Sequence, residues 1–283
     1  MNFDEYKWDM VIEAKQNPFS VGIRQIAEYR DLIFLFVKRD ITATYKQTIL
    51  GPLWYLFQPV FTTIMFIIVF RHMADLGTDG IPPILFYSIG TILWSFFSSL
   101  LISQARVFYA NKDIFSKVYF PRLTVPIAVI IGELIKLAIQ SVLFSIVYVV
   151  YLLNGYGYFL SYRLVFLPLI VLWTALMATG LGLIVSSITT RYRDLAKALE
   201  FFLSMFMYAA PVVYPLSEVS ERFRPFFVFN PVTAILECFR GLCFGTSEVS
   251  LFMILYSVGI TIILLLGGIL LFNKNEKAFV DVV

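Results

Sequence analysis

The chain has 283 residues, of which 59% are hydrophobic and 14% are charged, whereas a typical soluble domain carries about 25% charged residues. One soluble domain of this length could not bury so much apolar surface, so the composition excludes a water-soluble protein and indicates an integral membrane protein. The formal net charge of +3 is small and no basic tract is present, which gives no support to a nucleic-acid partner. The mixed-charge start, "MNFDEYKWDMVIEAKQ", has no apolar run, so we expect no cleavable signal and retention in the membrane by the spans.

The first elements in chain order are a short N-terminal segment and a helix in the membrane interface. We expect residues 1–22 to be a cytoplasmic segment and residues 23–283 to form one membrane domain. In residues 24–50, apolar and charged residues alternate at about helical spacing around a run, 32–37, that is too short to span a bilayer. This pattern predicts an interface helix with its cations toward lipid headgroups. The candidate headgroup-binding residues are Arg24, Arg30, Lys38, Arg39 and Lys46.

Six later segments are apolar over the ~20 residues that a transmembrane helix needs. They lie at about 53–70, 82–104, 123–152, 164–188, 195–214 and 250–272. The shorter apolar piece at 231–245 contains Glu237 and Arg240, so we expect it to enter the bilayer only partway, where protein or water covers it. The predicted fold is therefore all-α, with six transmembrane helices after an interface helix and a re-entrant segment at about 215–245.

The loops between these spans differ in their content of Lys and Arg. One side holds sixteen and the other holds five, while Lys136 lies inside a span. Cytoplasmic loops carry the excess of positive charge, so both termini are predicted to be cytoplasmic. An even number of spans agrees with that topology.

Polar and small residues inside the spans point to helix contacts. Glu133 and Lys136 are one turn apart in the third span and can pair with each other. The fourth span carries small residues at four-residue spacing, which lets helices approach closely. These are Thr174, Ala178, Gly182 and Ser186.

Two spans also carry aromatic and polar residues along one helical face. Trp54, Gln58, Phe61 and Met65 share a face of the first span, just after the corner that Gly51 and Pro52 form. Phe201, Met205, Tyr208 and Val212 share a face of the fifth span. Such faces can contact lipid, pack between helices, or line a path for a substrate.

Three stretches carry a resemblance to a known family: "RDITATYKQTILGPLWYLFQP", "RYRDLAKALEFFLSMFMYAAPVVYPLS" and "FNPVTAILECFRGLCFG". Their order and spacing resemble the permease subunits of bacterial ABC exporters for polysaccharides, which include the O-antigen, teichoic acid and capsule exporters and share the type-two ABC membrane fold. The resemblance covers nearly the whole chain from about residue 24.

This resemblance implies a half-transporter in the bacterial inner membrane that pairs as a homodimer and binds two copies of a separate cytoplasmic ABC ATPase subunit. A phosphate-cradling P-loop needs Gly-Lys, and none of the 15 glycines here precedes a lysine. We therefore expect no catalytic residues and no cofactor on this chain, with ATP and Mg²⁺ bound by the partner. The loop at 106–122 mixes cations with aromatics that we expect to be exposed, as suits a docking surface. The expected ATPase-coupling residues are Arg106, Phe108, Tyr109, Lys112, Asp113, Phe115, Lys117, Tyr119 and Arg122, and Phe120 is expected to be exposed with them. A loop resting on headgroups is the alternative.

In similar exporters the first and fifth spans form a channel at the dimer centre, and short re-entrant helices close its outer mouth. The channel-lining residues implied here are Trp54, Gln58, Phe61, Met65, Phe201, Met205 and Tyr208. The implied outer-gate residues are Tyr214, Glu218, Arg222, Arg224, Asn230, Glu237 and Arg240. An outer loop that only caps the bundle is the alternative for 215–245.

The resulting hypothesis is ATP-driven export of a lipid-linked, O-antigen-like glycan, whose pyrophosphate meets the cations of the interface helix. Each cation near such a surface contributes about 1 kcal/mol. The alternatives are the permease of an ABC exporter for teichoic acid, for a capsule polysaccharide or for a small molecule. An enzyme is disfavoured because the sequence has no Asp-x-Asp pair and no His or Cys set for a metal. A secondary transporter is disfavoured because no internal repeat is evident.

Overall fold

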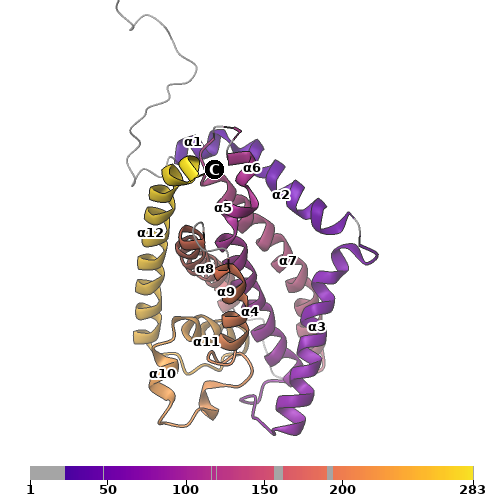
Figure 1. The fold of residues 1–283 in the computed structure, drawn as a ribbon. Coiled ribbons are helices and arrows are strands. Elements are labelled where there is room, and N and C mark those ends of the chain that lie inside the picture. The colour runs from indigo at the N-terminus through magenta and orange to yellow at the C-terminus, as the bar shows by residue number, and fades with distance from the viewer. Residues whose placement is uncertain are drawn as a thin grey trace, which may run out of the picture.

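The computed structural model describes residues 23–46, 48–115, 117–118, 120–155, 162–189 and 194–282, and only the backbone at 23–25, 45 and 275–282. Every regular element in these ranges is helical, which confirms the predicted all-α class (Figure 1). The predicted N-terminal segment, 1–22, lies outside the described residues.

Among the described residues, five helical segments are long and apolar enough to cross a membrane. The first comprises η2 (Gly51–Leu53), α3 (Trp54–Phe66) and η3 (Ile67–Met73). The others are α4 (Pro83–Ala105), α7 (Thr124–Leu153), η4 (Tyr162–Phe166) with α8 (Leu167–Thr189), and α12 (Leu251–Val282). These five match the predicted spans closely, since a run of apolar residues of bilayer length is a strong signal in a single sequence.

The segment predicted as the fifth span, 195–214, differs from the prediction. Its helix, α9 (Leu195–Phe206), has 12 residues and rises about 18 Å, against a bilayer core of about 30 Å. The chain continues in turns and then forms η5 (Leu216–Glu218), α10 (Arg224–Val228) and α11 (Pro231–Phe244). The predicted count of six spans is therefore not confirmed.

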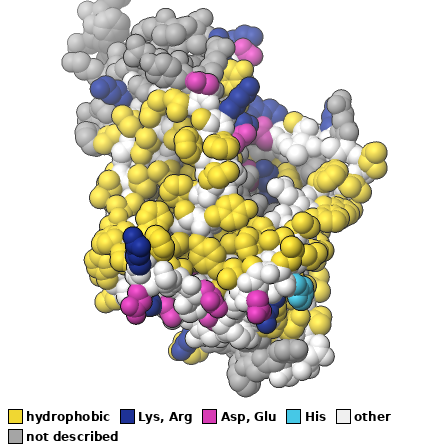
Figure 2. All heavy atoms as spheres, turned by 60° about the horizontal axis from the view of Figure 1, so that its bottom comes forward, with side chains coloured by type: hydrophobic (Ala, Val, Ile, Leu, Met, Phe, Trp, Pro, Cys, Tyr) yellow, Lys and Arg dark blue, Asp and Glu magenta, His cyan; other side chains and the backbone are white. Residues whose placement is uncertain are grey.

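The long helices run between two different ends of the molecule (Figure 1). One end carries α1 (Ile23–Glu28), α2 (Arg30–Tyr45), α5 (Val107–Ala110) and α6 (Lys112–Phe115), and α10 lies at the other. Helix α2 crosses its end at an angle to the long helices. The flank of the molecule is largely hydrophobic, and charged side chains gather toward the ends (Figure 2).

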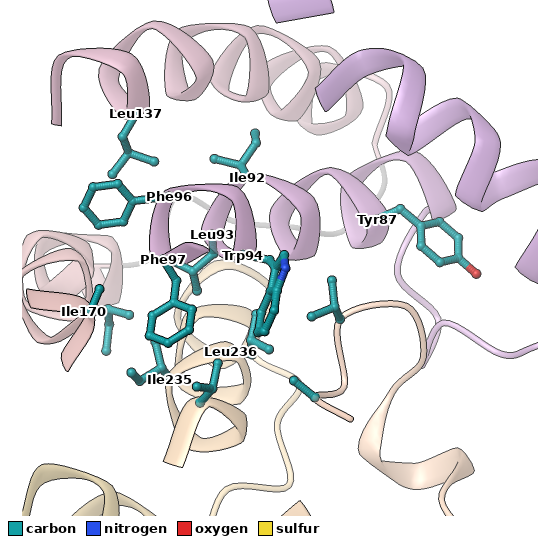
Figure 3. Close-up of a cluster of buried hydrophobic side chains, with 14 of the residues drawn as sticks. Tyr87, Ile92, Leu93, Trp94, Phe96, Phe97, Leu137, Ile170, Ile235 and Leu236 are labelled. Atoms are coloured by element: carbon teal, nitrogen blue, oxygen red, sulfur yellow. The ribbon is translucent and has the colours of Figure 1, made fainter. Parts of the chain in front are cut away.

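Helix α4 is central, because it packs against α3, α7, α8, α9 and α11. Its side chains point to several neighbours at once, with Phe96 near Leu137 of α7 and Phe97 near Ile235 of α11 (Figure 3). Helix α8 packs between α4 and α12. This arrangement leaves α3 and α9 at the edge of the bundle.

The predicted small-residue seam of α8 is confirmed. Thr174, Ala178, Gly182 and Ser186 are all buried. A Cβ placed on Gly182 would lie 2.4 Å from the Cβ of Gln104 on α4, closer than any side chain tolerates. The absence of a side chain at this position therefore sets the distance between α4 and α8.

A second core fixes the end that carries α2 and α5. Ile33, Phe36 and Val37 of α2 are buried there. Phe108 of α5 stacks on Phe272 of α12 with ring centroids 4.4 Å apart. The short helices are therefore attached rigidly to the bundle by aromatic packing.

Candidate functional site

The expected channel residues lie on two exposed faces at the edge of the bundle. Trp54, Phe61 and Met65 of α3 are 53%, 59% and 54% exposed, and Gln58 is exposed with them. Phe201 and Met205 of α9 are 61% and 54% exposed. Both helices pack against α4, so their exposed faces flank the same central helix.

The aromatic surface is larger than the sequence pattern indicated. Phe57 stacks on Phe61 with centroids 6.0 Å apart, and Phe202 and Phe206 are exposed beside Phe201. The helical spacing used for the prediction selects one narrow stripe, whereas these side chains spread over a wider arc.

The two faces meet near the ends of α9 and of η3. The rings of Phe70 and Tyr208 lie 6.4 Å apart. Val212, expected on the same face as Tyr208, is instead fully buried, because the helix ends at Phe206 and the chain turns inward. The face of α9 is therefore shorter than predicted.

Side chains from the following segment hold the irregular backbone after α9. The Tyr214 hydroxyl donates to the carbonyl of Tyr208 at 2.5 Å, and Asn230 Nδ2 donates to the carbonyl of Ala209 at 3.0 Å. Arg240 Nη2 donates to the carbonyl of Val212 at 3.1 Å. These three donors satisfy carbonyls that a continued helix would have paired with its own N–H groups.

Arg240 makes the most contacts of these three side chains. Its side chain is 2% exposed, pairs with Glu237 at 3.0 Å, and places its guanidinium 4.0 Å from the centroid of the Phe86 ring. A buried guanidinium is stable only where such partners replace water. The charges that made 231–245 a poor span in the sequence are thus buried as a pair.

The other expected gate residues lie at the surface. Glu218 is exposed and accepts a hydrogen bond from the Gly77 backbone N–H at 3.1 Å. Arg224 pairs with Glu248, and Arg222 lies 5.9 Å from the ring of Phe223. The structure brings together only Tyr214, Asn230, Glu237 and Arg240, all around the end of α9.

The structure corrects part of the prediction for the loop at 106–122. The expectation that Phe108, Phe115 and Phe120 are exposed is wrong, since all three are buried at 1%, 6% and 4%. They fill the core between α2 and α12, which leaves them unable to contact a partner.

A smaller set of that loop stays accessible. Tyr109, Asp113 and Lys117 are exposed and Lys112 is partly so, whereas Tyr119 lies outside the described residues. Arg122 lies over the ring of Phe115, 5.5 Å from its centroid.

Arg106 forms a link that the sequence did not reveal. Its Nη2 pairs with Glu200 Oε1, so the end of α4 is joined to α9. The two residues are 94 positions apart, and no local pattern could have matched them.

The cations expected at headgroups have different surroundings. Arg30, Lys38 and Lys46 are exposed, and the side chain of Arg24 lies outside the described residues. Arg39 is partly buried instead: it pairs with Asp40 at 2.7 Å and donates to Asn111 Oδ1 at 2.9 Å.

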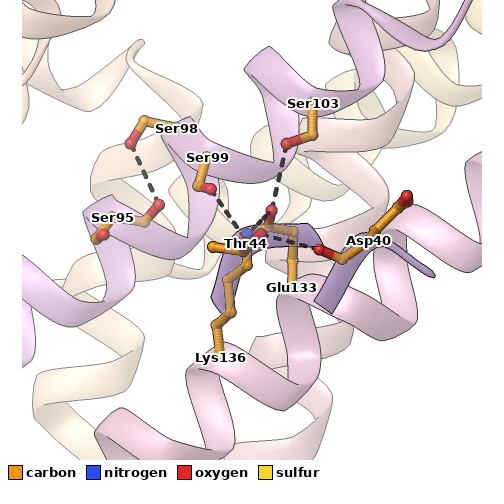
Figure 4. Close-up of polar contacts among 8 residues, drawn as sticks. All are labelled: Asp40, Thr44, Ser95, Ser98, Ser99, Ser103, Glu133 and Lys136. Atoms are coloured by element: carbon orange, nitrogen blue, oxygen red, sulfur yellow. Dashed lines mark hydrogen bonds and ion pairs between the residues drawn. The ribbon is translucent and has the colours of Figure 1, made fainter. Parts of the chain in front are cut away.

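Glu133 and Lys136 of α7 pair at 2.6 Å, as the sequence predicted. Figure 4 shows that Ser99 and Ser103 of α4 also point at Glu133, and their hydroxyls donate to it at 2.8 and 3.2 Å. Glu133 is thus a junction between two spans. Over the same described ranges, no three His, Cys, Asp or Glu side chains gather to form a metal site.

Five bilayer-length helices with a hydrophobic flank define a multi-pass membrane protein. Over residues 31–244 the chain matches the ABC-2 type transporter family, and it belongs to that family. Among its relatives is an O-antigen export system permease protein RfbA of Klebsiella pneumoniae, 26% identical over 89% of this chain and 95% of that protein. RfbA of Myxococcus xanthus is 22% identical, covering 92% of this chain and 98% of that protein. The polysialic acid transport protein KpsM of Escherichia coli is 21% identical over 85% of this chain and 92% of that protein.

Proposed function

We propose that this chain is the transmembrane subunit of an ATP-driven exporter that moves a lipid-linked, O-antigen-like polysaccharide across the bacterial inner membrane. The observation that carries this proposal is the end-to-end similarity to O-antigen export permeases, which leaves no large part of either chain unmatched. The catalytic machinery for ATP belongs to a separate subunit of the transporter.

The exposed aromatic surface supports a channel between two copies of the chain. Trp54, Phe61 and Phe201 project from the edge of the bundle, where a second copy can face them. Aromatic rings contact the CH faces of sugars without strong directionality, so a polymer can slide along them. In this homodimer α3 and α9 of both copies line the path.

The link between Arg106 and Glu200 supports a route for coupling to the ATPase. Arg106 begins the segment that exposes Tyr109 and Asp113, and Glu200 lies on α9 next to Phe201. A movement of the docked segment is therefore carried directly to a helix of the channel face. The exposed residues of the segment, rather than its buried phenylalanines, dock the partner.

The packing of helix α2 supports a position in the membrane interface, and α1 and the last turns of α12 lie at that same end of the molecule (Figure 1), which supports placing both termini in the cytoplasm. Its Ile33, Phe36 and Val37 pack on the bundle, while Phe34 and Leu35 on another side are 64% and 60% exposed. A helix with apolar residues toward protein and toward lipid suits the inner leaflet boundary.

In this proposal the segment after α9, at about 215–245, forms the outer mouth of the channel. Arg240, Asn230 and Tyr214 hold the turn after α9, so the outer segment moves together with the channel face.

An exporter of capsular polysaccharide is the second candidate, and the similarity to KpsM favours it. The two candidates share the fold and the partner and differ in the glycan. Analysis of the glycan that accumulates in a deletion strain separates them.

The first test is purification of the tagged chain from its native host in mild detergent, followed by mass spectrometry of the copurifying proteins. We expect an ATPase subunit with a P-loop at a 1:1 ratio to this chain. We also expect a deletion strain to lose a surface polysaccharide and to accumulate its lipid-linked form inside. Normal surface glycan in that strain, or a complex without an ATPase, would refute the proposal.

A further inference from the structure

A cavity of about 540 Å³ with charged residues in its lining lies between α2, α4, α5 and α7. Its volume falls within the ~300–1,000 Å³ that is usual for small-ligand sites. Three cations and two carboxylates line it, and the lining comes from the short helices α2 and α5 as well as from the spans α3, α4 and α7. The charged lining residues are Arg39, Asp40, Arg106, Glu133 and Lys136.

The carboxylate of Glu133 is committed to protein contacts. It accepts hydrogen bonds from Ser99, Ser103 and Lys136 and its side chain is only 5% exposed (Figure 4). Two neutral donors and one cation balance its charge. Glu133 therefore fixes the position of the Lys136 ammonium without using up the donors of that group.

The cations of the cavity keep donors to spare. A lysine ammonium has three N–H donors and an arginine guanidinium has five. The described residues give the Lys136 ammonium one acceptor, Glu133, and give the Arg106 guanidinium one, Glu200. They give Arg39 two, Asp40 and Asn111. The remaining N–H groups suit an anionic ligand with several oxygen atoms.

The cavity lies next to the start of the aromatic face. Tyr55 lines it, with Lys136 Nζ 5.4 Å from the Tyr55 ring centroid, and Trp54 precedes Tyr55 on α3. Gln140 of α7 donates to the Tyr55 carbonyl at 3.1 Å and holds the two helices together there. A ligand anchored in the cavity would thus have its remainder beside α3.

We propose that this cavity binds a phosphate group through Arg39, Arg106 and Lys136. This inference rests on the proposed function, within which the ligand is the diphosphate that joins the glycan to its lipid. A phospholipid headgroup offers the same chemistry, and the experiment separates the two sources. The site includes Lys136 and Arg106, whereas the exposed Lys38 and Arg30 of α2 lie outside it.

The test measures ligand binding by the purified full-length chain, with its ATPase when one copurifies, in phosphatidylcholine nanodiscs. The probes are farnesyl diphosphate, farnesol, inorganic pyrophosphate and phosphatidylglycerol, and the readout is a Kd from tryptophan fluorescence or native mass spectrometry. Arg39→Gln removes one cation. Glu133→Gln with Lys136→Gln removes both charges of the pair, so that no carboxylate is left buried alone. Lys274→Gln, which alters an exposed cation of α12 that is not part of the cavity lining, is the matched control.

We expect each cavity variant to raise the Kd for farnesyl diphosphate about tenfold, because a hydrogen bond to a charged group is lost. The control should leave the Kd unchanged, and farnesol should not compete. Equal affinity of wild type and both cavity variants would overturn the inference, as would failure of every phosphate probe to bind. Competition by phosphatidylglycerol at similar affinity would uphold the phosphate site and assign it to membrane lipid.

The inference and the proposed function can fail separately. Cation-dependent binding of farnesyl diphosphate in a chain that copurifies with no ATPase would uphold the site and reject the exporter. A functional exporter whose cavity variants bind every probe normally would reject the site alone. Size-exclusion profiles that match wild type show that each variant is folded.

Discussion

The buried ion pair of α11 offers the sharpest test of how the segment after α9 is held. Arg240 is 2% exposed, and Arg240→Ala removes its pair with Glu237, its hydrogen bond to Val212 and its contact with Phe86. Breaking a buried pair from one side costs about 3–5 kcal/mol, because the remaining charge loses its partner. At about 2–4 °C per kcal/mol, the midpoint of thermal unfolding should fall by about 6–20 °C.

The matched variant is Glu237→Gln with Arg240→Met, which removes both charges and keeps the volume of the side chains. We expect it to recover about half of the loss, since no isolated charge remains, although Val212 still lacks its donor. The measurement is the fraction of folded protein after heating in detergent, followed by fluorescence-detected size-exclusion chromatography. If Arg240→Ala unfolds within 2–3 °C of wild type (about 1 kcal/mol), or if the double variant is the less stable of the two, the reasoning is wrong.

Three further predictions concern packing and coupling. Glu200→Gln should change stability by less than about 1 kcal/mol, because its pair with Arg106 is half-exposed, yet it should lower glycan exported per ATP hydrolysed in reconstituted vesicles; an unchanged ratio removes the coupling role. Gly182→Leu should prevent folding or lower the unfolding midpoint by 10 °C or more, a cost of about 3 kcal/mol or more, because even a Cβ at this position would overlap α4. Normal expression and a normal melting curve would contradict the packing described. Tyr109→Ala should weaken ATPase copurification about tenfold without altering the melting curve, because this exposed side chain is proposed to contact the partner. Phe108→Ala should instead destabilise the chain by about 3–5 kcal/mol, because this side chain is buried. The reverse pattern would show that the buried ring is the docking contact.

Much of the candidate site was accessible from the sequence where the signal is local. The Glu133–Lys136 pair and the aromatic positions of α3 follow from helical spacing, which places residues three and four apart on one face. The predicted exposure of Phe108 and Phe115 was wrong, because a loop with cations and aromatics has the same composition whether its rings face a partner or the protein's own core. Their burial depends on Phe36 and Phe272, which lie far away in the chain.

The sequence by itself determined that the chain is a membrane protein, to which family it belongs, and the approximate positions of the five bilayer-length helices found among the described residues. Hydrophobic length and backbone hydrogen bonding leave an apolar segment in a bilayer almost no choice but a helix. Only the tertiary structure decided that the helix in the predicted fifth span ends at Phe206. That break is stabilised by hydrogen bonds from Asn230, the N-cap residue of α11, and from Arg240 within α11. The tertiary structure alone also brought Arg39, Arg106 and Lys136 around one cavity, since contacts between distant segments depend on how the helices pack.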